Sequence, residues 1–273
     1  MSAEHINNKP TIDQSGFPFA KRVNQITLQH PIAWLKAGWR DFRTAGWISV
    51  IYSLVVVLSG MAVSLGSYLM DMSYLIAPLS AGFVLIAPLF AVGFYDVSRR
   101  LETHDTPTLK TTFTAWRSNP VRFLGAGLAL VFFMIIWMRT AALIYFVSFP
   151  YTSPNLTQLI NMSVTTSEGL SFLAVGSVIG CVLATFAFLL SAVSLQMMMQ
   201  EKTDFLPAIL TSISAVIKNF KPMVFWAALI VLLTFIGILT AFIGLIIVMP
   251  LLGHASWHAY RDLIAIDETN DHS

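Results

Sequence analysis

The stretch 223–260 constrains the fold of this chain more than any other segment. Its 38 residues contain no Asp, Glu, Lys or Arg. About 20 helical residues cross a bilayer, so this stretch is too long for one span and suits two. Gly237 and Gly244 lie near its middle, where a tight turn would separate two helices. We therefore expect a transmembrane hairpin built from 223–239 and 241–260.

Composition places the whole chain in the membrane class. Of its 273 residues, 56% are hydrophobic and 11% are charged, whereas roughly a quarter of the residues in a soluble domain are charged. The first 29 residues are polar and lack the apolar core of a signal peptide, so we expect the first span to act as its own insertion signal. We predict an all-α polytopic membrane protein with six transmembrane helices, at about 45–68, 74–95, 123–149, 171–199, 223–239 and 241–260.

The sixteen Lys and Arg residues support this layout with both termini in the cytoplasm. Six precede the first span, five lie between spans two and three, three lie between spans four and five, and Arg261 follows span six. The three loops on the opposite side contain none, and Arg139 lies inside span three. A five-span arrangement would place Arg261 outside. We expect a multi-pass membrane protein with both termini in the cytoplasm.

A weak internal repeat divides the membrane domain into three parallel units. The apolar and basic pattern of 35–43 recurs 74 residues later at 109–117, and a similar pattern follows after a further 100 residues. Each copy then enters a pair of predicted spans, so the unit is an interfacial helix plus a hairpin. We predict one domain over 30–264, units at about 30–105, 106–205 and 206–264, a disordered cytoplasmic tail at 1–29 and a second cytoplasmic tail at 265–273.

The first interfacial helix is predicted over 31–43, with Leu35, Trp39 and Phe42 on one face and basic residues on the neighbouring face. For the second, Thr106 and Pro107 are the expected N-cap and first-turn proline. We expect these helices to lie on anionic lipid, with a membrane-protein partner as the alternative. The predicted lipid-contacting residues are Lys36, Arg40, Arg43, Lys110 and Arg117.

Equivalent positions near the cytoplasmic ends of spans two, four and six hold Asp96, Gln196 and His258. If the units surround a pseudo-threefold axis, these side chains would converge into a polar layer. His254 precedes His258 by four residues, so the two share a helix face at a spacing that metal ligands use. The alternative interpretation treats both histidines as interfacial polar residues beside Trp257 in an aromatic belt.

Arg139 is the one charge predicted deep in a span, where an unpaired cation costs several kcal/mol on most scales. It would contact an anion or lipid headgroup within the bundle. Alternatively, it extends to the outer phosphates or pairs with Asp71 or Glu168, the only acids predicted on that side.

The segment Gly253-His-Ala-Ser-Trp-His258, together with Trp34-Leu-Lys-Ala-Gly-Trp-Arg-Asp41, resembles an uncharacterised proteobacterial membrane family known only as a domain of unknown function. Some of its members carry the label cytochrome c oxidase subunit I. The resemblance covers about 30–262 and implies a multi-span inner-membrane protein of no known activity. The plan of three hairpins also resembles the membrane-anchor region of bacterial glycerophosphodiester phosphodiesterases, whose catalytic domain is absent here.

The sequence contains no phosphate-binding glycine loop, nucleophile elbow or metalloprotease His-Glu motif. We therefore expect a non-enzymatic accessory, assembly or lipid-organising component, with membrane lipids as partners, no cofactor and no bound nucleic acid. One alternative is a small transporter or channel for a lipid-like or weakly polar solute, suggested by the repeat and the proline-containing spans. A haem- or metal-binding membrane protein is the third.

Overall fold

The computed structural model describes residues 23–149, 156–201 and 203–265. These residues are almost entirely helical, and within them the only β-structure is an isolated antiparallel bridge between Val23 and Ile264. The predicted all-α fold is confirmed. Most of the two predicted tails lies outside the described residues.

The helices can be grouped, in chain order, by the three predicted units. The first unit contains α1 (His30–Ala45), α2 (Trp47–Leu69), the 3-10 helix η2 (Ser73–Leu75) and α3 (Ile76–Glu102). The second contains α4 (Leu109–Phe113), the 3-10 helix η3 (Ala115–Ser118), α5 (Pro120–Ser148), α6 (Leu156–Thr165), α7 (Ser167–Ser191) and α8 (Ser194–Gln200). The third contains α9 (Phe205–Lys218), α10 (Phe220–Leu239) and α11 (Leu245–Leu263).

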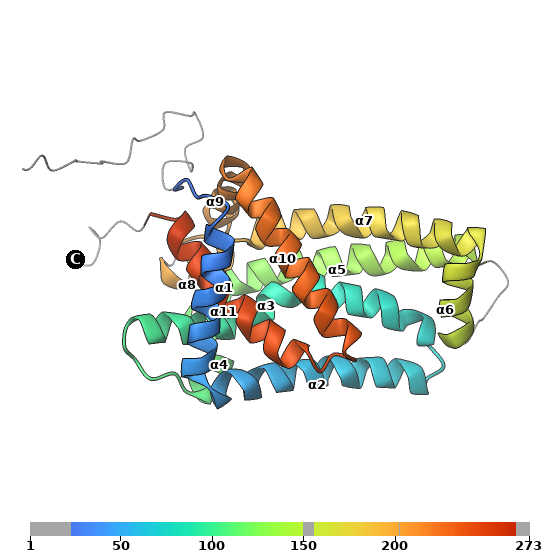
Figure 1. Cartoon of the computed structure of the whole chain (residues 1–273), viewed down its shortest axis with the longest axis horizontal. Coiled ribbons are helices and arrows are strands. Elements are labelled where there is room, and N and C mark those ends of the chain that lie inside the picture. Colours follow the sequence, from blue (N-terminus) through green and yellow to red (C-terminus); the bar gives the residue numbers. More distant parts are fainter. Residues whose placement is uncertain (1–22, 150–155, 202, 266–273) are drawn as a thin grey trace, which may run out of the picture.

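The long helices α2, α3, α5 and α7 run along the long axis of the molecule, and α10 and α11 cross them obliquely (Figure 1). Helix α11 packs against α1, α2, α3 and α10, whereas α5 packs between α3 and α7. The short helices α4, α8 and α9 gather with α1 at one end, and α6 lies at the other (Figure 1). The segments predicted to be interfacial therefore share one end, as a parallel repeat requires.

Five helices in the described part of the chain are long and apolar enough to cross a membrane. They are Trp47–Leu69, Ser73–Glu102, Phe123–Ser148, Ser167–Gln200 and Phe220–Leu239. The sixth predicted span is the 19-residue helix α11, which is apolar in its first half and polar in its second. Helix α11 buries much of its surface against other helices, so it does not need a continuous apolar face toward lipid.

The second interfacial helix differs from its prediction. Thr108, rather than Thr106, is the N-cap, and the helix begins after Pro107. The Thr108 hydroxyl accepts the Thr111 N–H at 3.2 Å, and the Thr111 hydroxyl accepts the Thr108 N–H at 3.1 Å. This reciprocal pair is a capping box, which fixes the helix start. The helix is short, and the chain continues as η3.

The predicted loop over 150–170 also contains an unforeseen helix, α6.

The fourth predicted span, 171–199, is interrupted. Helix α7 ends at Ser191 and α8 begins at Ser194. Ser212 from α9 donates its hydroxyl to the Leu189 carbonyl at 2.8 Å and accepts the Val193 N–H at 3.3 Å. Because backbone groups freed by a helix break need partners inside a membrane protein, this one side chain stabilises the interruption.

The turn between α10 and α11 places Ala241 and Phe242 in the left-handed region, with φ of 52° and 68°. The predicted helix over 241–260 therefore starts four residues too early. The Thr240 hydroxyl accepts the Gly244 N–H and donates to the Gly237 carbonyl, each at 2.8 Å. These bonds hold a conformation that costs a non-glycine residue roughly 1–2 kcal/mol.

We expect Ala241→Gly to raise the free energy of unfolding by about 0.5–1 kcal/mol, because glycine adopts positive φ without steric cost while gaining some unfolded-state entropy. Ala241 is exposed, so the change removes little packing. The measurement is thermal unfolding of the detergent-solubilised protein. Ala228→Gly, at an exposed position within α10, is the matched control and should lower stability by about 0.5–1 kcal/mol. Equal losses in both variants would contradict the prediction.

Candidate functional site

The close packing of α1 on α11 organises the end of the molecule where the short helices gather. A Cβ atom added to Gly38 would lie 2.6 Å from the Ala255 nitrogen and 2.8 Å from the Leu251 carbonyl oxygen. Only glycine fits at this approach, because the two backbones touch. The buried face of α1 carries Pro31, Trp34, Gly38, Asp41 and Ala45.

The buried face of α1 differs from its predicted apolar stripe of Leu35, Trp39 and Phe42. Trp39 is 44% exposed, and the other two are half-buried. The side of α1 that meets α11 contains a glycine and an acid because close helix approach favours small residues and a polar partner lies opposite. Trp34 is the bulky apolar side chain on this inward face and is 1% exposed.

His254 is fully buried and joins three helices. Its Nε2 lies 2.9 Å from the Ser49 hydroxyl of α2, and its Nδ1 lies 2.8 Å from the Ser98 hydroxyl of α3. A neutral imidazole donates from one nitrogen and accepts at the other, and a serine hydroxyl can do either. Both ring nitrogens are therefore satisfied without a ligand.

His258 extends this arrangement to α1. Its Nε2 lies 2.8 Å from Oδ2 of Asp41, which is 7% exposed. Ser98 also hydrogen-bonds Asp41, so the two histidines belong to one connected set. We call Asp41, Ser49, Ser98, His254 and His258 the polar hub.

The hub sets the charge state of Asp41. Burial by itself would raise the pKa of this carboxyl. Hydrogen bonds from His258 and Ser98, and the favourable charge interaction with the histidines, outweigh burial and hold the pKa of Asp41 below its usual value. The carboxylate is thus the stable form at neutral pH, and it anchors His258.

Further contacts secure the last turns of α11. Glu102 of α3 accepts the Trp257 indole N–H at 3.0 Å and pairs with Arg261 at 2.9 Å. The Trp34 indole donates to Asp262 at 2.7 Å. Helices α1 and α3 thus both bind side chains at the end of α11.

Three more hydrogen bonds join the last turns of α11 to other segments. The Gln196 amide donates to the Ser256 carbonyl at 3.3 Å, and the Tyr260 hydroxyl donates to Glu201 at 3.1 Å. Asn24 donates its backbone N–H to the Leu263 carbonyl at 2.8 Å. The chain entering α1 is therefore hydrogen-bonded directly to the end of α11.

The residues of the predicted polar layer bind different partners. Asp96 pairs with Arg99 and Arg100 of its own helix, at 2.5 and 2.7 Å. Gln196 contacts the carbonyls of Ala192 and Ser256, and His258 contacts Asp41 as above. Within the described part of the chain, no hydrogen bond or ion pair joins Asp96, Gln196 and His258 to one another. Of the four predicted members, only His254 and His258 lie in one network.

Arg139 lies exposed on α5 rather than in the interior of the bundle. None of the residues in 23–149, 156–201 and 203–265 forms an ion pair with it. It lies nine residues before the end of α5, about 14 Å along the helix at 1.5 Å per residue. A long side chain at that depth can extend toward the outer phosphates.

Metal-binding geometry is absent from the described residues, since no group of three or more His, Cys, Asp or Glu side chains is placed to hold an ion. The neighbouring Met197, Met198 and Met199 are buried in the main hydrophobic cluster. Their role there is packing.

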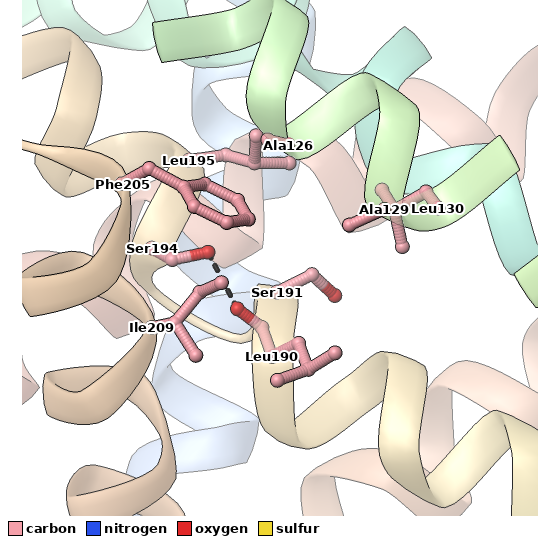
Figure 2. A pocket seen from close by; sticks show the side chains of 9 residues that line it. All are labelled: Ala126, Ala129, Leu130, Leu190, Ser191, Ser194, Leu195, Phe205 and Ile209. Carbon is pink, nitrogen blue, oxygen red and sulfur yellow. Dashed lines mark hydrogen bonds between the residues drawn. The ribbon is translucent and has the colours of Figure 1, made fainter. Parts of the chain in front are cut away.

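Figure 2 shows a small pocket beside the break between α7 and α8. Its volume of about 10 Å³ is roughly what one water molecule needs. Its hydroxyls come from Ser191 and Ser194, which donate to the Ala187 and Leu190 carbonyls at 2.7 and 2.6 Å. The remaining lining is apolar, so the pocket has neither the size nor the free polar groups of a solute site.

The predicted lipid-contacting residues all lie at the surface. Lys36, Arg40 and Arg43 are exposed and, with Trp39 and Thr44, line an open groove of about 400 Å³ on α1. We call these five residues the basic groove.

The equivalent residues of the second unit, Lys110 and Arg117, are also exposed. The Arg117 guanidinium lies 5.3 Å from the centre of the Trp116 ring.

Sequence patterns did not single out Asp41, Ser49, Ser98 or Glu102 as functional residues. For Asp41 a signal exists, since Trp34, Gly38, Asp41 and Ala45 recur at helical spacing and define the buried face. The two serines carry no comparable signal, because serine is common in transmembrane helices.

The fold and the site together define a polytopic α-helical membrane protein whose polar interior joins α11 to the first unit. Residues 75–200 match the family model described as "predicted integral membrane protein (DUF2189)". This match confirms the resemblance to an uncharacterised membrane family. The cytochrome oxidase label and the likeness to phosphodiesterase anchors stay predictions. No curated protein and no solved structure matches the chain.

We expect Gly38→Ala to lower the free energy of unfolding by about 1–3 kcal/mol or more, because the added methyl group meets backbone atoms that cannot rotate away. Unfolding in detergent measures this loss. Gly176→Ala on α7 is the control, since a Cβ there meets no atom within 4 Å. That variant should stay within about 1 kcal/mol of the wild type. A Gly38→Ala protein as stable as the control would refute the proposed close approach.

Asp41 should make stability depend on pH. Because its folded-state pKa is lowered, its contribution is complete above the unfolded-state pKa of about 3.9 and is lost as pH falls through the lower folded value. We expect the stability difference between wild type and Asp41→Asn to shrink between about pH 5 and about pH 3, measured by detergent-solubilised unfolding. Asp71→Asn, at an exposed turn residue, is the control. A difference that does not change with pH would contradict the role of Asp41.

Proposed function

We propose that this protein is a non-enzymatic, lipid-organising component of the bacterial inner membrane, with both termini in the cytoplasm. The observation that carries the proposal is the contrast between its two polar regions. The polar hub faces inward and its groups bind one another, whereas the basic groove is exposed and its cations have no acidic partner among the described residues.

The state of the hub supports a structural rather than a catalytic role. A general base needs a free position near a substrate, and a cavity to admit one. Both nitrogens of His254 have serine partners, and His258 is bound to Asp41. Neither the pocket at the break between α7 and α8 nor the basic groove is lined by a hub residue.

The transporter alternative draws on the interrupted α7–α8 helix and on Pro88 and Pro250 inside helices. Its weakness is the size of the pocket at the interruption, where there is room for about one water. The haem or metal alternative lacks a ligand set in the described part of the chain. We therefore favour the lipid-organising role.

The test is the lipid composition around the protein. Patches of bacterial membrane excised by copolymer should contain roughly two-fold more anionic phospholipid than the bulk membrane, because exposed cations attract such lipids. Mass spectrometry of the co-purified lipids measures the ratio, and an unrelated six-span protein excised in the same way is the control. A patch with the bulk composition would refute the proposal. Solute uptake by proteoliposomes containing the purified protein would favour transport instead.

A further inference from the structure

We propose that the basic groove is a binding site for the phosphate of an anionic phospholipid headgroup. This inference rests on the proposed function and names its ligand and its site. The groove residues are Lys36, Trp39, Arg40, Arg43 and Thr44, all exposed on α1.

Charge is the first argument. Three cations lie within about 10 Å along one helix, from Lys36 to Arg43 at 1.5 Å per residue. No described carboxylate pairs with any of them. Asp41, the one acid of α1, points the other way and is bound to His258. The groove therefore carries a positive potential that nothing in the described structure neutralises.

Shape is the second argument. The five residues are spaced three and four positions apart along α1, so their side chains share one open face and can reach the same ligand. An arginine fork binds phosphate oxygens through two hydrogen bonds, and a lysine adds a mobile point charge. Arg40, Arg43 and Lys36 supply both kinds of group. An open site of this form suits a headgroup that enters from the side while its chains stay in the bilayer.

Position is the third argument, and it favours a lipid over free phosphate. Gly46, with φ of 56°, ends α1, and Trp47 begins α2, the first of the membrane-length helices. Helix α1 crosses α2 steeply at the end of the bundle (Figure 1). Trp39 and Trp47 are 44% and 62% exposed there, as expected of tryptophans at the headgroup level. The groove thus lies where lipid phosphates lie.

The experiment uses the full chain in a neutral detergent. Calorimetric titration compares dihexanoyl phosphatidylglycerol, dihexanoyl phosphatidylcholine and inorganic phosphate. We expect phosphatidylglycerol to bind at least about ten-fold more tightly than either other probe, because it offers an uncompensated phosphate charge together with acyl chains. The triple variant Lys36→Gln, Arg40→Gln, Arg43→Gln should lose roughly 100-fold in affinity, at about 1 kcal/mol for each basic residue.

The matched control is Lys221→Gln, which removes an exposed basic residue at the start of α10. It should keep its affinity within roughly five-fold of the wild type. Equal losses in both variants would show general charge attraction and overturn the site. Inorganic phosphate binding as tightly as the lipid would overturn the lipid assignment. Circular dichroism checks that the triple variant, altered only at exposed positions, remains helical.

The two experiments distinguish failure of this binding site from failure of the proposed function. If membrane patches are enriched in anionic lipid but the triple variant binds phosphatidylglycerol like the wild type, the site is wrong and the lipid-organising role stands. If the patches are not enriched, the role itself fails.

Discussion

The hydrogen bonds around His254 are the interaction on which the rest of the fold depends. A buried imidazole without partners would cost several kcal/mol in a low-dielectric interior. Ser49 and Ser98 satisfy it, and Asp41 satisfies His258 one turn later. Because these partners come from α1, α2 and α3, helix α11 has one favourable placement. An apolar helix of the same length could rotate against its neighbours, whereas this one cannot without leaving polar groups unpaired.

The three predicted units share some local contacts and differ in others. Asn119 and Asn219, which precede α5 and α10, both donate their amides to the backbone of another segment: Asn119 to the Met198 carbonyl at 3.5 Å, Asn219 to the Asn24 carbonyl at 2.9 Å. The interfacial helices diverge more. Helix α1 is long and carries the basic groove, whereas α4 is shortened by its capping box. The asparagine contacts are thus similar in the second and third units, whereas the interfacial helices of the first and second units differ in length and in exposed residues.

Sequence patterns predicted the helical class, the clustering of interfacial segments and most span positions, because apolar length and charge placement follow directly from bilayer physics. These patterns did not predict features that depend on which helices pack together. The inward face of α1 was missed because Gly38 and Asp41 carry no apolar signal, and only the close approach of α11 makes them a packing surface. The partners of His258 were missed for the same reason, since only packing brings it to a residue 217 positions away.

The long sequence separation between His258 and Asp41 determines when their contact can form during synthesis. The first unit reaches the membrane with Ser49, Ser98 and Asp41 in place, but the histidines that complete their bonds emerge 156 to 217 residues later. Until then these groups depend on water or lipid headgroups, and closing so long a loop carries an entropic cost. The last helix to be synthesised is therefore the one that locks the first, so a nascent chain truncated before α11 cannot acquire the mature architecture.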